Sequence, residues 1–229
     1  MTAIEGIFFD LDGTLVDTAD DFVITINRML ADAERAPMEP ECIRRNVSAG
    51  SRILMQMAFE LTPGDALEQK RNEFLHRYDC HIQDKSRPSS ATLYPYIPEL
   101  LNNIEQQGIT WGIVTNKPRP YALKILEQLE LLDRSAVLVC PEDVSKTKPH
   151  PEALLQACQK TRCTPERSLY IGDHGRDIQA GKAAKMLTVA ALYGYIADSD
   201  DPSQWQADLS IQNVSELNRW LEQKNWAMT

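Results

Sequence analysis

The N-terminal part of the chain changes abruptly from the pattern of a buried strand to that of helices. Residues 4–10 form a short apolar run that ends at a carboxylate, which predicts a buried parallel strand. Residues 18–84 show apolar side chains at helical spacing, and a polar, turn-rich segment follows at residues 84–90. Beyond it, helix and strand patterns alternate. Because such alternation requires crossover connections, we expect an α/β fold with a Rossmann-like, doubly wound parallel sheet.

The later elements are predicted from apolar periodicity and from the glycine and proline residues that flank them. Helices are expected at residues 51–61, 67–82, 97–107, 120–129, 151–160 and 214–224. Strands are expected at residues 109–115, 136–140 and 169–172, with possible edge strands at residues 187–192 and 209–211.

The helical block separates the first strand from the other strands, so we interpret it as an insertion. A core domain is expected to comprise residues 1–17 and 90–229. Residues 18–89 are expected to form a small all-helical domain inserted after the first strand.

The charge balance restricts the partners that the chain can bind. Its 229 residues include 33 acidic and 24 basic side chains, a net charge of −9, which argues against nucleic acid or an anionic membrane. No apolar run approaches the ~20 residues of a membrane span. The five cysteines form no C-x-x-C pair and the first residues lack a basic signal region, so we expect reduced thiols and a cytoplasmic location.

Two carboxylates stand at the end of the first predicted strand, in the sequence Asp10-Leu11-Asp12-Gly13-Thr14. Side chains two residues apart face the same side of a strand, so Asp10 and Asp12 can share one crevice. A phosphatase needs a nucleophile and a separate proton donor, and these two residues can divide the roles. A calcium-binding loop would need a further oxygen ligand and a later glutamate, and the sequence has neither.

Two more polar clusters follow later strands. After residues 109–115, Thr115 and Asn116 are candidates for binding a phosphoryl oxygen and the substrate, although a Thr-Asn pair alone is more often part of a turn. Lys148 lies before a predicted helix, and the proline after it fixes the nearby backbone, which favours it over Lys146 as the phosphate partner. A solvated basic turn is the alternative for that cluster.

The fourth cluster, Gly172-Asp173-His174-Gly175-Arg176-Asp177, follows the strand predicted at residues 169–172. Magnesium prefers oxygen ligands, so Asp173, Asp10 and the Asp12 carbonyl form a suitable set, with Asp177 binding or orienting from nearby. A turn capped by an aspartate would explain the presence of Asp173 alone or of Asp177 alone. It does not explain acidic residues at two strand ends that face one crevice. Magnesium disfavours imidazole, so the role of His174 stays open.

Taken in order, DLDGT, TN, KPHPE and GDHGRD resemble the motifs of the haloacid dehalogenase superfamily, in its subgroup with a helical cap, over the whole chain. The resemblance implies that Asp10 is the nucleophile and Asp12 the acid/base. It further implies that Thr115 and Lys148 bind the phosphoryl group. It also implies that the last motif, with Asp173 and Asp177, forms the part of the site that binds Mg²⁺.

The forms TNKP and KPHPE, with the chain length, are most similar to phosphoglycolate phosphatases. NVSAGSR and YGYI are similar to N-acetylmuramic acid 6-phosphate phosphatases. The expected partner is therefore a small-molecule phosphomonoester, acted on by a monomer or homodimer. The alternatives are a sugar phosphomutase, a dehalogenase and a non-catalytic regulator. The paired aspartates argue against the dehalogenase, and the filled catalytic positions argue against the regulator.

The resemblance implies that residues 1–17 and 90–229 form the catalytic core and that residues 18–89 form the cap domain, which is expected to set substrate specificity. Ser48, Gly50 and Arg52 stand where a loop opens a predicted helix, a place that suits anions. Ordinary helix capping beside a surface arginine explains the same residues equally well. We expect the cap to close over the crevice and exclude bulk water.

Overall fold

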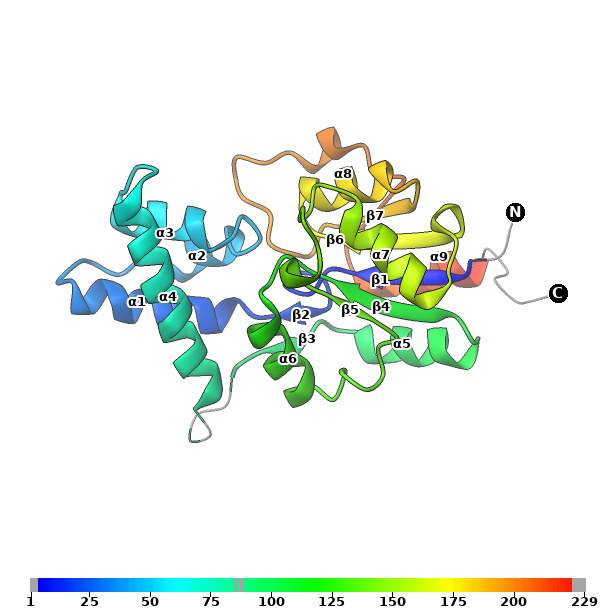
Figure 1. Cartoon of the computed structure of the whole chain (residues 1–229), viewed down its shortest axis with the longest axis horizontal. Helices are drawn as coiled ribbons and strands as arrows, with labels where there is room; N and C mark the ends of the chain where they lie inside the picture. The colour runs from blue at the N-terminus through cyan, green and yellow to red at the C-terminus, as the bar shows by residue number, and fades with distance from the viewer. Residues whose placement is uncertain (1–3, 85, 87–88, 224–229) are drawn as a thin grey trace.

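The computed structural model describes residues 4–84, 86 and 89–223. Its centre is a six-stranded sheet in which every neighbouring pair is parallel. This architecture confirms the predicted α/β fold class (Figure 1). The strands lie in the order β5 (Leu138–Val139), β4 (Thr110–Val114), β1 (Gly6–Phe9), β6 (Ser168–Gly172), β7 (Leu187–Ala191) and β8 (Leu209–Ile211).

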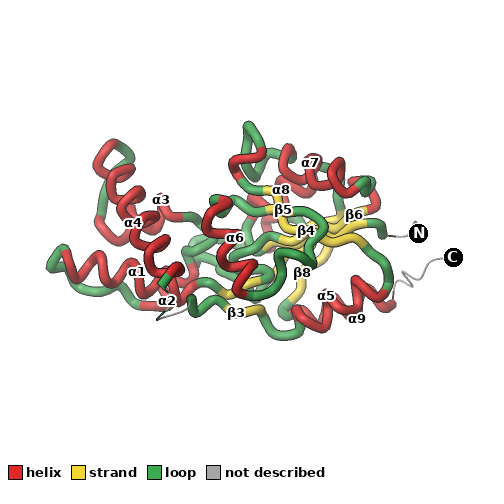
Figure 2. The backbone as a smooth tube through the Cα atoms, turned by 60° about the horizontal axis from the view of Figure 1, so that its bottom comes forward, coloured by secondary structure: helices red, strands yellow, loops and turns green. Residues whose placement is uncertain are grey.

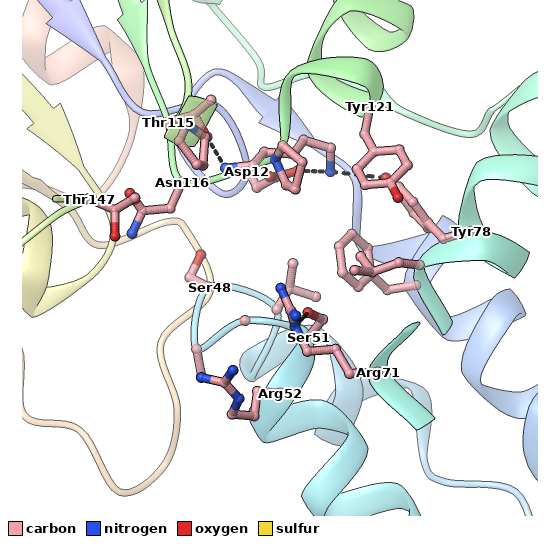
Figure 3. Close-up of a pocket in the computed structure, with 18 of the residues that line it drawn as sticks. Asp12, Ser48, Ser51, Arg52, Arg71, Tyr78, Thr115, Asn116, Tyr121 and Thr147 are labelled. Atoms are coloured by element: carbon pink, nitrogen blue, oxygen red, sulfur yellow. Dashed lines mark hydrogen bonds and ion pairs between the residues drawn. The ribbon is translucent and has the colours of Figure 1, made fainter. Parts of the chain in front are cut away.

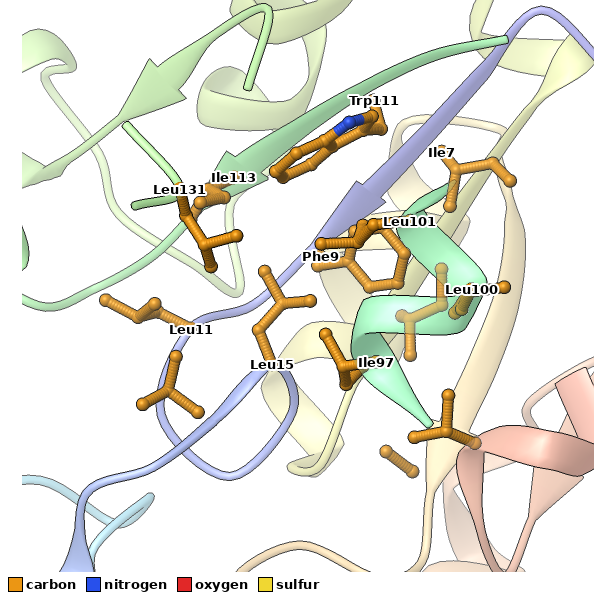
Figure 4. Packing of buried hydrophobic residues seen from close by; sticks show 14 of the residues in the cluster. Ile7, Phe9, Leu11, Leu15, Ile97, Leu100, Leu101, Trp111, Ile113 and Leu131 are labelled. Atoms are coloured by element: carbon orange, nitrogen blue, oxygen red, sulfur yellow. The ribbon is translucent and has the colours of Figure 1, made fainter. Parts of the chain in front are cut away.

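Helices cover both faces of the sheet (Figure 2). Successive side chains of a strand point to opposite faces, so Ile7 and Phe9 enter one apolar cluster and Phe8 enters another. Figure 4 shows the first cluster, where Phe9 and Trp111 pack beside Leu101. The first face is covered by α5 (Ile97–Gln106), α6 (Arg119–Gln128) and α9 (Val214–Gln223), and the second by α7 (Glu152–Thr161) and α8 (Gly175–Ala183).

Four helices between two short strands make a separate unit beside the sheet (Figure 1). Strands β2 (Val16–Asp17) and β3 (Thr92–Leu93) pair antiparallel where the chain leaves and re-enters the sheet domain. The helices share their own apolar cluster, in which the Phe22 ring lies 4.8 Å from that of Tyr78. They are α1 (Ala19–Asp32), α2 (Pro40–Arg45), α3 (Ser51–Phe59) and α4 (Asp65–Gln83).

The two segments that connect the helical unit to the sheet domain are joined through Asp21, which is fully buried on α1. Its carboxylate accepts hydrogen bonds from the Ser89 hydroxyl and from the Ser90 backbone and hydroxyl at 3.0 and 2.8 Å. The His81 ring nitrogen lies 3.0 Å from the same carboxylate. A buried carboxylate needs such partners, and here they hold both connections together.

Most predicted elements are present within a few residues of the expected bounds, with four differences. The two-residue strands β2 and β3 were not predicted, because two residues are too few to show an alternating pattern. The six-residue helix α2 was not predicted, since so short a helix has little periodicity. The prediction that residues 187–192 form an edge strand was wrong, because β8 pairs with β7 and itself forms the edge. Three short 3-10 helices occupy loops: Pro141–Asp143, Pro165–Arg167 and Pro202–Trp205.

Parts of two predictions lie outside the described residues. Residues 85, 87 and 88 belong to the predicted turn-rich segment, and residue 224 to the predicted end of the last helix. Of the helices that the structure describes, none combines the length and hydrophobicity needed to cross a membrane.

Candidate active site

Polar residues from three neighbouring strands meet at one edge of the sheet. Asp10, Thr115 and Asp173 directly follow β1, β4 and β6, whose carboxyl ends lie side by side because the strands are parallel. Asp10 and Thr115 line a cavity of about 390 Å³ whose opposite wall comes from α3, α4 and the loop before α3 (Figure 3). The structure therefore brings the predicted clusters together at one crevice.

Lys148 is the cation at the centre of this arrangement. Its Nζ lies 2.9 Å from Asp10 Oδ1 and 2.7 Å from Asp177 Oδ1. It also donates to the Tyr170 hydroxyl at 2.7 Å and to the Val114 carbonyl at 3.1 Å. The side chain of Lys148 is fully buried, so these contacts hold its charge at a fixed place next to Asp10.

Three buried carboxylates offer a place for a metal ion. Oxygen atoms of Asp10, Asp173 and Asp177 lie within 4.8 Å of one another. Burial raises the pKa of Asp10 to about 6, with Lys148 opposing and Asp177 adding to the rise. Burial, and then the charges of Asp10 and Asp177, raise the pKa of Asp173 well above its usual value. One lysine does not balance three carboxylates, so a hard cation fits this cluster.

The surroundings of Asp173 support that fit. Its Oδ2 accepts hydrogen bonds from the Ser48 hydroxyl and the Tyr195 backbone, each at 2.8 Å. Its Oδ1 is buried and, among the described residues, has no hydrogen-bond partner. A buried carboxylate oxygen without a partner is costly, and a metal ion or its bound water would satisfy it.

The glycine of the first motif is required by this packing. Gly13 has a φ of +78°, and a Cβ there would lie 1.9 Å from Asp173 Oδ2. Any side chain at this position would therefore both strain the backbone and displace the aspartate. Gly13 thus allows the loop after β1 to approach Asp173 directly.

Asp12 lies outside the group of three carboxylates and has partners of its own. Its Oδ1 accepts from the Lys117 ammonium at 2.9 Å and from the Thr18 hydroxyl at 2.6 Å. Lys117 is buried and also donates to the Tyr78 hydroxyl on α4 at 3.0 Å. Lys117 lies within the TNKP motif, but no role for it was predicted from the sequence. Its place directly after Thr115 and Asn116 was the available signal.

The predicted residues after β4 support the loops as well as lining the cavity. The Thr115 hydroxyl accepts from the Lys117 backbone at 3.0 Å. The Asn116 side chain donates to the Lys148 carbonyl at 3.0 Å and accepts from the Lys148 backbone N–H at 3.2 Å. Asn116 therefore ties the loop after β4 to the loop that carries Lys148.

The three predicted cap residues line the cavity but differ in their contacts. The Ser48 hydroxyl reaches Asp173, and the Ser48 carbonyl accepts from the Arg176 guanidinium. Gly50, with a φ of +95°, precedes the first turn of α3. Arg52 is 58 % exposed and pairs with Glu68 at 2.6 Å. No role was predicted for Arg176, although it lies between Asp173 and Asp177 in the fourth motif.

His174, whose role the sequence left open, caps helix α8. Its Nδ1 accepts from the Arg176 backbone at 3.1 Å, while its own backbone N–H donates to Asp177 Oδ2 at 3.1 Å. Its ring stacks on Trp205 with 6.4 Å between centroids. Burial, and then Arg176, lower the pKa of His174, which keeps the ring neutral and able to accept. The residue therefore positions the turn that carries Asp173 and Asp177.

Comparison with known proteins places this site in a family. Residues 7–191 match the model of the haloacid dehalogenase-like hydrolases. An N-acetylmuramic acid 6-phosphate phosphatase from Pseudomonas aeruginosa is 43% identical over 93% of both chains. A phosphoglycolate phosphatase from Xanthomonas campestris pv. campestris is 39% identical over 93% of this chain and 94% of its own.

A solved structure has the same overall arrangement. The crystal structure described as a predicted phosphoglycolate phosphatase from Haemophilus somnus superposes with a TM-score of 0.82 and 25% identity. It covers 96% of this chain and 99% of that protein. The family match spans most of the chain and both curated relatives align over nearly their whole length. The chain therefore belongs to the haloacid dehalogenase-like hydrolase family, and its curated relatives there are phosphatases.

Proposed function

We propose that the protein is a magnesium-dependent phosphatase that removes phosphate from a small phosphomonoester through an aspartyl-phosphate on Asp10. The observation that carries this proposal is the position of the Asp10 carboxylate, at the end of β1 and 2.9 Å from Lys148 Nζ. Asp10 also borders the cavity beside Asp12 and Thr115. The proposed nucleophile, the proposed proton donor and one proposed phosphoryl-binding residue therefore line one cavity, which supports this proposal.

In the proposed reaction, an Asp10 oxygen attacks phosphorus in line with the leaving oxygen. Asp12 gives a proton to the departing alcohol, and the phosphoryl group remains on Asp10. Asp12, now a base, takes a proton from the water that hydrolyses this acyl phosphate. Lys148 and the Thr115 hydroxyl hold phosphoryl oxygens throughout, so positioning and electrostatics supply most of the rate acceleration.

The proposed metal ligands are Asp10, Asp173 and the backbone carbonyl of Asp12. When bound, Mg²⁺ would offset the repulsion between the carboxylates and the dianionic phosphate. The Asp177 carboxylate is held by Lys148 at one oxygen and by the His174 N–H at the other. We therefore assign Asp177 mainly to positioning Lys148, with any contact to the metal secondary.

We further propose that residues 18–89 act as a cap over a core of residues 1–17 and 90–229. The separate apolar cluster of α1–α4 and their contribution to the cavity wall support this division. Ser48 provides the contact between the two parts at the metal end, through its 2.8 Å hydrogen bond to Asp173. Opening of the cap would break that bond and expose the cavity to solvent.

Two leaving groups are candidates, glycolate and N-acetylmuramic acid, after the names of the curated relatives. A cavity of about 390 Å³ is large for the two-carbon glycolate. Its wall includes Phe22, Tyr78 and Tyr121, whose rings suit the faces of a sugar. These features favour N-acetylmuramic acid 6-phosphate over 2-phosphoglycolate.

The test is phosphate release with Mg²⁺ over a panel of phosphometabolites that includes both candidates. We expect turnover that requires Mg²⁺ and is abolished by Asp10→Asn, with the higher kcat/KM for the amino sugar phosphate. Retained turnover in that variant would disprove the nucleophile assignment. Transfer of phosphate between sugar positions, without release, would instead identify a phosphomutase.

A further inference from the structure

We propose that the cap side of the cavity holds a second anion site, built around Arg71, that binds a carboxylate on the leaving group. The site would make the enzyme selective for phosphomonoesters whose alcohol part is itself anionic. This inference rests on the proposed phosphatase function, because it concerns the far end of the same substrate.

The geometry of Arg71 is the first observation. Arg71 lies on α4 and lines the cavity, across from Asp12 and Thr115 (Figure 3). Its Nε donates to the Ser51 hydroxyl at 3.2 Å, which holds the guanidinium at the first turn of α3. Its Nη2 donates to no residue that the structure describes, so this part of the fork is available to a ligand.

The charge on this wall is the second observation. Among the described residues, the charged side chains that the helical unit contributes to the cavity are Arg52 and Arg71. Both contact one carboxylate, Glu68, at 2.6 and 3.4 Å respectively. Two cations with one shared acid leave a net positive charge. That charge faces the space in which the leaving group must lie, so the wall favours an anion.

The two arginines are not equivalent. Arg52 holds Glu68 in the shorter ion pair and its side chain is 58 % exposed. Arg71 makes the longer contact, at 3.4 Å, and its side chain is only 31 % exposed. An ion pair of poor geometry gives up its donor at little cost, whereas a short one resists exchange. Arg71 is therefore the better placed of the two to bind a substrate, because its Nη2 has no partner among the described residues and its contact with Glu68 is long.

A carboxylate is the anion that matches this group. The planar fork of a guanidinium binds a carboxylate through two parallel hydrogen bonds. Here they would come from Nη2 and from Nη1, which must leave its 3.4 Å contact with Glu68. The Ser51 hydroxyl and the first-turn N–H groups of α3 add further donors. A substrate with its phosphate at Asp10 would then extend across the cavity to Arg71. Discrimination against uncharged leaving groups follows, because they leave the guanidinium without its partner.

The experiment compares two sugars that differ by one carboxylate-bearing ether. N-acetylmuramic acid 6-phosphate carries the lactyl carboxylate and N-acetylglucosamine 6-phosphate lacks it. A second pair, 2-phosphoglycolate and ethyl phosphate, tests the same difference on a small leaving group. Arg71→Met removes the charge, Arg71→Lys keeps the charge without the fork, and Arg77→Met is the control on the same helix. Arg77 is paired with Asp32 and Glu73.

We expect Arg71→Met to lower kcat/KM for the carboxylated substrate of the preferred pair about 10- to 100-fold, mainly through KM. Its partner without the carboxylate should lose far less, because it has no group to pair with the Arg71 guanidinium. Arg71→Lys should retain an intermediate preference, and Arg77→Met should behave as the unaltered protein. Equal losses on both substrates, or no loss on the carboxylated one, would overturn the proposal.

Failure of the phosphatase assignment would look different. In that case the unaltered protein would release no phosphate from any of these substrates or from p-nitrophenyl phosphate, with or without a change at Arg71. If the enzyme hydrolyses p-nitrophenyl phosphate in an Asp10-dependent manner but neither carboxylated substrate, the phosphatase function stands and the anion site is wrong.

Discussion

Replacing Asp10 by asparagine should stabilise the metal-free protein while it removes the nucleophile. The Asp10 carboxylate is largely buried at the cavity wall, and the cost of burying its charge exceeds the attraction of Lys148, so its pKa rises to about 6. A folded-state pKa above the unfolded one means that ionisation costs stability. The protonated Asp10 side chain contributes to the free energy of unfolding. This contribution is fully present below the pKa of the unfolded state and is lost as the pH rises through about 6.

The magnitude follows from the two pKa values. A rise from 3.8 to about 6 corresponds to ~3 kcal/mol at high pH, at ~1.4 kcal/mol for each unit of pH. At pH 5 the folded group is mostly protonated, and the cost falls to roughly half. Asparagine imitates the protonated acid and removes the cost at every pH. For a chain of this size, ~3 kcal/mol corresponds to roughly 6–12 °C in Tm.

The assay is thermal unfolding in a chelator, followed by circular dichroism at pH 8 and pH 5. The Asp10→Asn variant should unfold at the higher temperature at pH 8, and the gap should narrow by about half at pH 5. Asp133→Asn, an exposed change, is the control and should leave Tm unaltered. A variant that is less stable than the unaltered protein at pH 8, or a gap independent of pH, would refute the reasoning.

Three further results are expected. Gly13→Ala should abolish turnover by displacing Asp173. Gly108 has a similar φ of +68°, but no atom lies within 4 Å of a Cβ built there, so Gly108→Ala should keep activity and lower the free energy of unfolding in urea by only ~1–2 kcal/mol. Asp21→Ala should lower the free energy of unfolding by ~2–4 kcal/mol, because it leaves the buried Ser89 hydroxyl and the partly buried Ser90 donors without their acceptor. The exposed Asp20→Ala should change it far less. Mg²⁺ at about 100 times its Kd should stabilise the protein by ~2.7 kcal/mol in thermal unfolding, an increase that Asp173→Asn should remove.

The sequence allowed the centre of the site to be predicted because of a rule about parallel sheets. Asp10, Thr115 and Asp173 each follow a strand, and the carboxyl ends of parallel strands share one edge. Local patterns were therefore enough to bring these residues together. The position of β7 inside the sheet could not be predicted in this way. It depends on the parallel pairing of β7 with β8, two strands that lie about twenty residues apart and are joined by a crossover connection.

Contacts across the cavity could not be predicted from local sequence patterns either, because they join residues that are far apart in the sequence. The hydrogen bond from Lys117 to Tyr78 joins the loop after β4 to the helical unit, and these two residues are 39 positions apart in the sequence. The orientation of Arg71 depends on how α4 packs against α3, which no single helix pattern specifies. Arg52 could be noticed from its loop, but its pairing with Glu68 required the structure.

The central claim is that phosphate is carried on Asp10 and released with the help of Asp12. It is tested most directly by Asp12→Asn with p-nitrophenyl phosphate and Mg²⁺, because this leaving group needs no proton donor. We predict a burst of one nitrophenolate per enzyme, followed by a stall, with one phosphoryl group found on Asp10 by mass spectrometry of the quenched protein. Absence of a burst, or a phosphoryl group on any other residue, would contradict the account.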